Sequence, residues 1–215
     1  MTSPPGGETG KRRPIAVPVA ALVIATGLGI TAALGGFAEA SEAPPQQLGP
    51  GSSLDQGEFT TKFTEARSLF QRDPFDGGGK RFLEIELEVT NKSDETTGVG
   101  APGRGKTPGF MFAQSLLKMD PEIGGDLGPT VSVPDEGVPS RQLHPGMTST
   151  VVVRYELPAG DRPPKKVKLD VGVFEEPETF NIDLGWVLVK DGDAGDAPPK
   201  VAAQVTLPVN QGGTP

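Results

Sequence analysis

Eight consecutive residues, "GAPGRGKT" at 100–107, match the phosphate-binding pattern G-x-x-x-x-G-K-[ST] at every constrained position. A working P-loop joins a buried strand to a helix, so that the N-terminus of the helix and backbone N–H groups surround the phosphates. The sequence around the match fits poorly, because Pro108 and Gly109 stand where the helix should begin. We therefore expect a loop that matches the pattern by chance. A small P-loop nucleotide-binding protein is kept as an alternative function.

A second cluster is acidic and lies in "DGDAGDAP", with Asp191, Asp193 and Asp196 on a glycine-containing loop. Carboxylate oxygens are the ligands that Ca²⁺ prefers, so these three residues form a candidate metal site. Their spacing departs from the EF-hand pattern and lacks its distant glutamate. A solvated turn between two strands is the simpler interpretation, and a calcium-stabilised surface adhesion module is the second alternative function.

Residues suited to catalysis are few. His144 is the single histidine, it stands in the turn-like "LHPGM", and the chain has neither a cysteine nor a G-x-S-x-G serine motif. Glu84, Glu86 and Glu88 could in principle support glycoside hydrolysis. They alternate with apolar residues, however, and are expected to form the wet face of a strand. We predict no catalytic residue, no cofactor and no enzymatic activity.

Charge limits the partners of the main domain. The 215 residues carry a net charge of −8, and beyond the first 37 residues there are 17 basic and 27 acidic side chains. Such a surface repels nucleic acid and anionic lipid, so neither is an expected partner of this part of the chain. A protein of the cell envelope is the expected partner class.

The N-terminal region predicts the location. Residues 14–38 contain no charge and as a helix would extend roughly 37 Å, enough to cross a hydrocarbon core of about 30 Å. Basic residues at 11–13 precede this run and Glu39 follows it, which places the N-terminus in the cytoplasm. The predicted organisation is a cytoplasmic tail (1–13), a transmembrane signal anchor (14–38), a flexible linker (39–57), an extracytoplasmic domain (58–209) and a C-terminal tail (210–215).

Two other interpretations of the apolar run remain open. The small residues "AEA" at 38–40 fit a signal-peptidase site, and cleavage near Ala40 would release the domain as a secreted protein. A buried core helix is the other interpretation, although Pro18, Gly27 and Gly29 disfavour it.

The rest of the chain shows strand patterns. In "RFLEIELEVTN", apolar residues at 83, 85, 87 and 89 alternate with glutamates, a period of two that buries one face of a strand. Similar runs are "EFTTKFTEARSLF", "MTSTVVVRYELP", "KKVKLDVGVF", "DLGWVLVK" and "KVAAQVTLPV", while "GFMFAQSLLKM" at 109–119 is ambiguous between strand and helix. Seven to eight strands separated by turns predict an all-β, antiparallel sandwich.

The order of these segments resembles the small immunoglobulin-like domains of bacterial membrane-anchored proteins and lipoproteins, the telokin-like class. Those domains have a strand ending in Val-x-Asn-x-Ser/Gly-Asp, matched by Val89 to Asp94, and a later Pro-Gly turn before a strand ending in Leu-Pro, matched by His144 to Pro158. The resemblance implies an immunoglobulin-like β-sandwich, an exported location and a binding or accessory role without catalytic residues. The loops 92–109 and 121–143 are the expected contact regions.

Overall fold

The computed structural model describes residues 44–72, 78–124, 128–135, 137–177, 185–192 and 194–211. Within these ranges the regular structure is β-strand, apart from one 3₁₀ helix, η1 (Phe112–Ser115). The all-β prediction is therefore confirmed. No helix of the described ranges is long and apolar enough to cross a bilayer. The predicted transmembrane helix, residues 14–38, lies outside the described residues.

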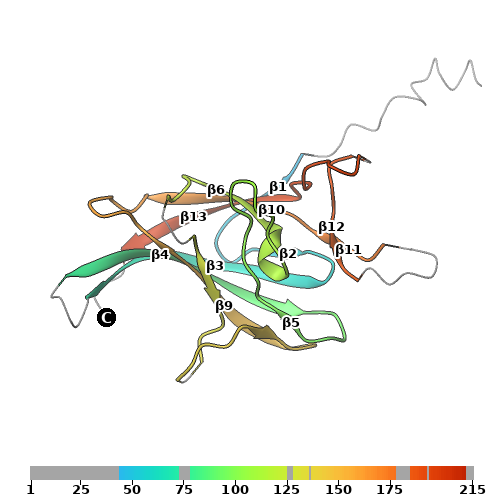
Figure 1. The fold of residues 1–215 in the computed structure, drawn as a ribbon, viewed down its shortest axis with the longest axis horizontal. Coiled ribbons are helices and arrows are strands. Elements are labelled where there is room, and N and C mark those ends of the chain that lie inside the picture. The colour runs from blue at the N-terminus through green and yellow to red at the C-terminus, as the bar shows by residue number, and fades with distance from the viewer. Residues whose placement is uncertain are drawn as a thin grey trace, which may run out of the picture. The chain divides into compact units, whose positions relative to one another are not determined.

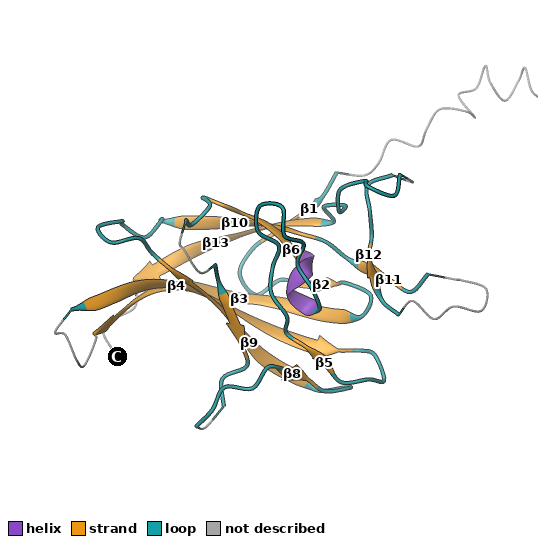
Figure 2. Cartoon of the chain, in the orientation of Figure 1, coloured by secondary structure: helices purple, strands orange, loops and turns teal. Residues whose placement is uncertain are grey.

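Nine strands form one mixed sheet that curls into two layers (Figure 1). Its order is β6-β10-β13-β3-β4-β9-β7, with β1 beside β13 and β2 beside β3. The nine strands are β1 (Gln46–Leu48), β2 (Ser53–Asp55), β3 (Phe59–Arg72), β4 (Gly79–Asn91), β6 (Leu116–Asp120), β7 (Thr130–Ser132), β9 (Thr148–Glu156), β10 (Lys166–Val171) and β13 (Ala203–Gln211). Two ribbons of paired strands complete the fold, β5 (Thr97–Gly98) with β8 (Gln142–Leu143) and β11 (Phe174–Glu175) with β12 (Val187–Leu188); long loops connect many of these elements (Figure 2).

Strand β13 joins the two layers. Its residues 203–208 pair antiparallel with β10, and β1 pairs with the start of β13 in parallel. The last residues, 209–211, pair in parallel with 66–68 of β3. These two parallel pairings correct our prediction of a purely antiparallel arrangement. A period-two pattern identifies strands but does not specify the direction of the neighbouring strand.

The predicted linker was too long at its C-terminal end. Within the range 39–57, β1 pairs with β13 and β2 pairs with β3, and Leu54 of β2 is buried in the core. Each of these strands has three residues, too few to display an alternating pattern. Likewise β13 continues to Gln211, past the predicted domain end at 209. Pairing with an existing strand edge fixes such short segments.

The other predicted strand runs all contain strands, and the alternating residues face the core. Leu83, Ile85, Leu87 and Val89 of β4 are completely or almost completely buried. The ambiguous segment 109–119 contains both kinds of structure, first η1 and then β6. Its apolar run is therefore divided between a tight turn and an edge strand.

Polar side chains also connect the layers. Gln56 is fully buried in the turn between β2 and β3, and its Nε2 donates to the Gly172 carbonyl at 2.7 Å, just after β10. Its side-chain carbonyl accepts a hydrogen bond from Thr61, and its backbone carbonyl accepts one from the Phe174 N–H at 2.8 Å. This arrangement attaches the start of β3 to the loop between β10 and β11. Each buried polar atom of Gln56 is thereby satisfied.

Asn91 explains the Val-x-Asn-x-Ser motif. This fully buried side chain donates from Nδ2 to the carbonyls of Glu95 at 2.8 Å and Leu143 at 3.0 Å. Its Oδ1 accepts hydrogen bonds from the backbone N–H and hydroxyl of Ser93. The side chain thus shapes the turn after β4 and attaches it to β8.

We expect Asn91→Ala to lower the free energy of unfolding by about 2–3 kcal/mol, because it leaves buried backbone groups without partners. Urea unfolding of the variant and the parent protein measures this loss. Asn210→Ala, at an exposed position of β13, is the control and should change stability little. Equal effects of the two substitutions would contradict the assigned role of Asn91.

Glu58 makes stability depend on pH. Desolvation by burial raises the pKa of this carboxyl from 4.5 to about 7. The folded protein therefore holds the proton more tightly than the unfolded chain does. The resulting stabilisation is complete below about pH 4.5 and is lost as the pH rises through about 7.

We expect the Tm of the parent protein to fall more steeply between about pH 5 and pH 8 than that of Glu58→Gln, which cannot ionise. Thermal unfolding followed by circular dichroism at both pH values provides the comparison. Parallel changes in Tm would show that Glu58 does not cause the pH dependence.

Candidate functional site

The residues of the P-loop pattern form a β-hairpin. Arg104 and Thr107 exchange two backbone hydrogen bonds of 2.9 Å around the Gly105-Lys106 turn. Ala101 and Phe110 pair further along the same hairpin. The next helical element is η1, which has four residues and follows Met111. Residues 100–115 thus lack the strand, loop and helix arrangement of a P-loop.

The hairpin also explains the two glycines of the pattern. Gly100 has φ of 65°, and a Cβ atom there would lie 1.9 Å from the carbonyl oxygen of Phe110. Gly105 has φ of 56° within the turn. Both positions favour glycine for backbone reasons that are independent of a phosphate. The geometry supports the interpretation of a chance match.

The acidic cluster is only partly described. Asp191 and Asp196 lie on a hairpin in which Lys190 pairs with Pro199, whereas Asp193 lies outside the described residues. Among the residues that the structure describes, no group of three acidic or histidine side chains is placed to hold a metal ion. The calcium site therefore stays an untested prediction. His144 is exposed, and its Nδ1 lies 3.1 Å from the Thr96 hydroxyl.

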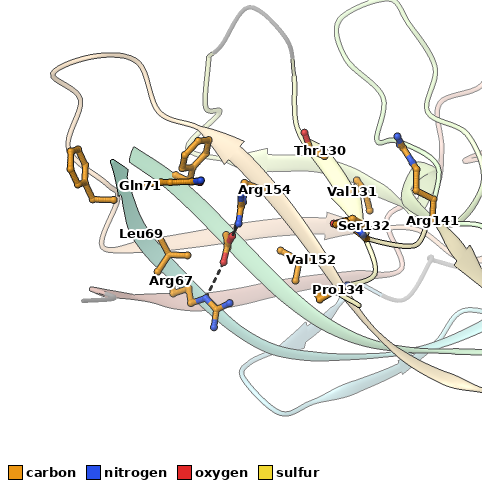
Figure 3. Close-up of a pocket in the computed structure, with 14 residues that line it drawn as sticks. Arg67, Leu69, Gln71, Thr130, Val131, Ser132, Pro134, Arg141, Val152 and Arg154 are labelled. Atoms are coloured by element: carbon orange, nitrogen blue, oxygen red, sulfur yellow. Dashed lines mark hydrogen bonds and ion pairs between the residues drawn. The ribbon is translucent and has the colours of Figure 1, made fainter. Parts of the chain in front are cut away.

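A groove that the sequence analysis did not anticipate lies over the outward face of β3, β4, β9 and β7 (Figure 3). Its volume is about 900 Å³. Its walls are completed by Pro134, Pro139 and Arg141, which follow β7 in the chain. The residues around the groove are Arg67, Leu69, Phe70, Gln71, Phe82, Glu84, Thr130, Val131, Ser132, Pro134, Pro139, Arg141, Val152 and Arg154.

An ion-paired triad forms part of this groove. Glu84 on β4 lies in register between Arg67 on β3 and Arg154 on β9. The Arg67 Nε lies 3.0 Å from one carboxylate oxygen, and the Arg154 Nε lies 2.6 Å from the other. Only 2% of the surface of Glu84 is exposed. The predicted wet face is thus wrong at this position, because the two long arginine side chains cover the glutamate.

Further charges and one ring hold the arginines. Burial alone would lower the pKa of Arg67, but the hydrogen bond that Arg67 donates to Glu84 and the charges of Glu84, Glu86 and Glu65 together raise it. The guanidinium of Arg154 lies 5.2 Å from the centre of the Phe82 ring, a cation–π distance. Both arginines therefore have defined positions at the groove.

The outward face of β3, β4 and β9 carries more apolar side chains than a strand pattern with one polar face predicts. Leu69 and Phe82 are cross-strand neighbours on this face, and Val152 is almost fully buried there. A sequence signal was present in the three consecutive valines 151–153, since adjacent strand residues point to opposite faces. A strand with apolar residues on both faces has a covered or binding surface on its second side.

The lining of the groove mixes charged and apolar side chains. It combines three arginines and one glutamate with aromatic, aliphatic and proline side chains, and contains neither cysteine nor histidine. Apolar walls with a few placed polar groups are typical of recognition sites. No protein-family model, curated protein or solved structure matches this chain. The likeness to telokin-like domains therefore stays a prediction.

Proposed function

We propose that this chain is a membrane-anchored, extracytoplasmic, immunoglobulin-like binding or accessory module of a cell envelope, without catalytic activity. The groove over β3, β4, β9 and β7 is its binding site. The observation that carries the proposal is the apolar and arginine-rich character of a sheet face that would otherwise be polar. The uncharged run at 14–38 and the basic residues at 11–13 support the location.

The two-layered arrangement of the curled sheet supports the immunoglobulin-like part of the proposal. So does the turn after β4, where Asn91 contacts the segment leading to Pro145 and Gly146. A rigid sheet that carries a groove and long loops is a suitable frame for recognition.

Photo-crosslinking in intact cells tests whether the groove binds a partner. A photoreactive amino acid is placed in the full-length chain at Gln71, which lines the groove, and in a second variant at Lys166 on β10. Both positions are exposed, but Lys166 lies outside the groove. We expect a discrete adduct with an envelope protein from Gln71 and none from Lys166.

The same pattern of adducts from both positions would reflect random collisions and would contradict the proposal. Absence of an adduct from Gln71, repeated with the probe at Ser132 on β7, would also contradict it. Placing the probe on two strands guards against one unfavourable orientation.

A further inference from the structure

We infer that the groove binds an extended protein segment in which acidic and apolar side chains are interleaved. This inference rests on the proposed binding function and specifies the chemistry of the partner. It depends on three features of the groove. These are its charge, its apolar floor, formed by Leu69, Phe82 and Val152, and the structure of the wall that follows β7.

The charge of the groove is opposite to that of the protein. Its lining has two more positive than negative side chains, although the whole chain has a net charge of −8. Arg141 is exposed, and its guanidinium has no hydrogen-bond or ion-pair partner among the described residues. In Arg154, Nε and one terminal nitrogen contact Glu84, and the second terminal nitrogen does not contact this carboxylate. Planar guanidinium groups with free N–H donors match the geometry of carboxylates.

The apolar floor distinguishes a peptide from a small anion. A carboxylate or phosphate bound by the arginines would leave the partly exposed Leu69 and Phe82 facing water. The volume of about 900 Å³ is in the range of sites that enclose much larger ligands. Successive side chains of an extended segment point to opposite sides. A segment whose groove-facing side carries both acidic and apolar residues therefore covers the floor and reaches the arginines together.

Backbone hydrogen bonds and prolines hold the described residues that form the wall after β7. Val133 and Ser140 exchange two backbone hydrogen bonds of 2.9 Å, and Pro134 and Pro139 stand just inside this pair. Proline fixes the backbone angle φ and so reduces the freedom that the wall loses on binding. A concave site with such a wall fits a chain segment better than a flat lipid surface.

Binding of labelled synthetic peptides to the full-length protein in detergent micelles tests the inference. The probe, called the Glu-Leu peptide, is a short peptide that repeats Glu-Glu-Leu-Leu, so that each side of the extended chain presents both residue types. Its two comparison peptides replace either Glu by Lys or Leu by Ser. Fluorescence anisotropy should show the Glu-Leu peptide binding at least about tenfold more tightly than either comparison peptide, with affinity falling as salt is added.

Two charge-reversal variants localise the interaction. Arg141→Glu should weaken binding of the Glu-Leu peptide about tenfold or more, because it replaces an available donor by a repelling charge. Lys166→Glu makes the same change of charge on the other layer and should have little effect. Both side chains are exposed, so neither substitution is expected to disturb the fold.

Several results would overturn the inference. The first is that the Glu-Leu peptide does not bind. The second is that the Lys-Leu or the Glu-Ser peptide binds as tightly as the Glu-Leu peptide or more tightly. The third is that Arg141→Glu and Lys166→Glu change the affinity equally. The crosslinking test described above separates this failure from that of the proposed function. If the groove forms a specific adduct but the Glu-Leu peptide does not bind, the proposed binding function is supported and only this class of partner is rejected.

Discussion

Replacing Phe59 by alanine is expected to lower the free energy of unfolding by about 4 kcal/mol. Phe59 is completely buried at the start of β3. Its ring makes edge contacts with Phe112 of η1 at 5.2 Å and Phe174 of β11 at 5.5 Å between centroids. One ring of β3 therefore packs against two elements that are distant in sequence, η1 and β11, and its removal leaves a cavity between them.

Chemical denaturation of Phe59→Ala and Phe110→Ala provides the test. Phe110 is 53% exposed on the 101–110 hairpin, so the same change of side chain should cost much less there. The midpoint of the Phe59→Ala transition should move far more than that of Phe110→Ala. Comparable losses would show that Phe59 is not the centre of the core.

Replacing Arg67 by leucine is expected to cost about 3 kcal/mol. The substitution leaves the buried Glu84 with Arg154 alone and removes the positive charge near Glu65 and Glu86. A buried carboxylate that loses one of its two charged partners keeps its desolvation penalty without full compensation. Urea unfolding should therefore show a clear loss of stability.

A second substitution identifies the cause of this loss. Adding Glu84→Leu to Arg67→Leu removes the buried charge, and the double variant should be more stable than Arg67→Leu alone. The control is Lys62→Leu, which breaks the ion pair with Glu88 on the same two strands. Both side chains of that pair are more than 40% exposed, so its loss should cost below about 1 kcal/mol. A double variant no more stable than the single one would contradict the role of Glu84.

The sequence predicted the core more accurately than the edges of the fold. Alternation in β4 identified the buried set from Leu83 to Val89, because a long strand repeats its period several times. β1 and β2 fell within the predicted linker because that stretch is rich in Pro, Gly, Ser and Gln and offers little to bury, and three residues carry no periodic signal. Their position is determined by the edges of β13 and β3, which is tertiary information.

The groove was not predicted from the sequence, which holds only a partial signal for it. The adjacent valines 151–153 indicated a strand with two apolar faces, but no local pattern aligns Arg67, Glu84 and Arg154. Their contact follows from the registers of β3 with β4 and of β4 with β9, and these registers join segments far apart in the chain. Conversely, the P-loop match was local, and the pairing of Arg104 with Thr107 shows why a local match is insufficient evidence for a site.

Protease accessibility in intact, wall-stripped cells tests most directly the central claim of an exported binding domain. The full-length chain carries a C-terminal tag, and a cytoplasmic protein is followed in the same samples. We predict loss of the tagged domain while the cytoplasmic protein remains intact, because the charges around residues 14–38 indicate an extracytoplasmic domain. Protection of the domain until the cells are lysed would contradict the predicted location and the proposed envelope function.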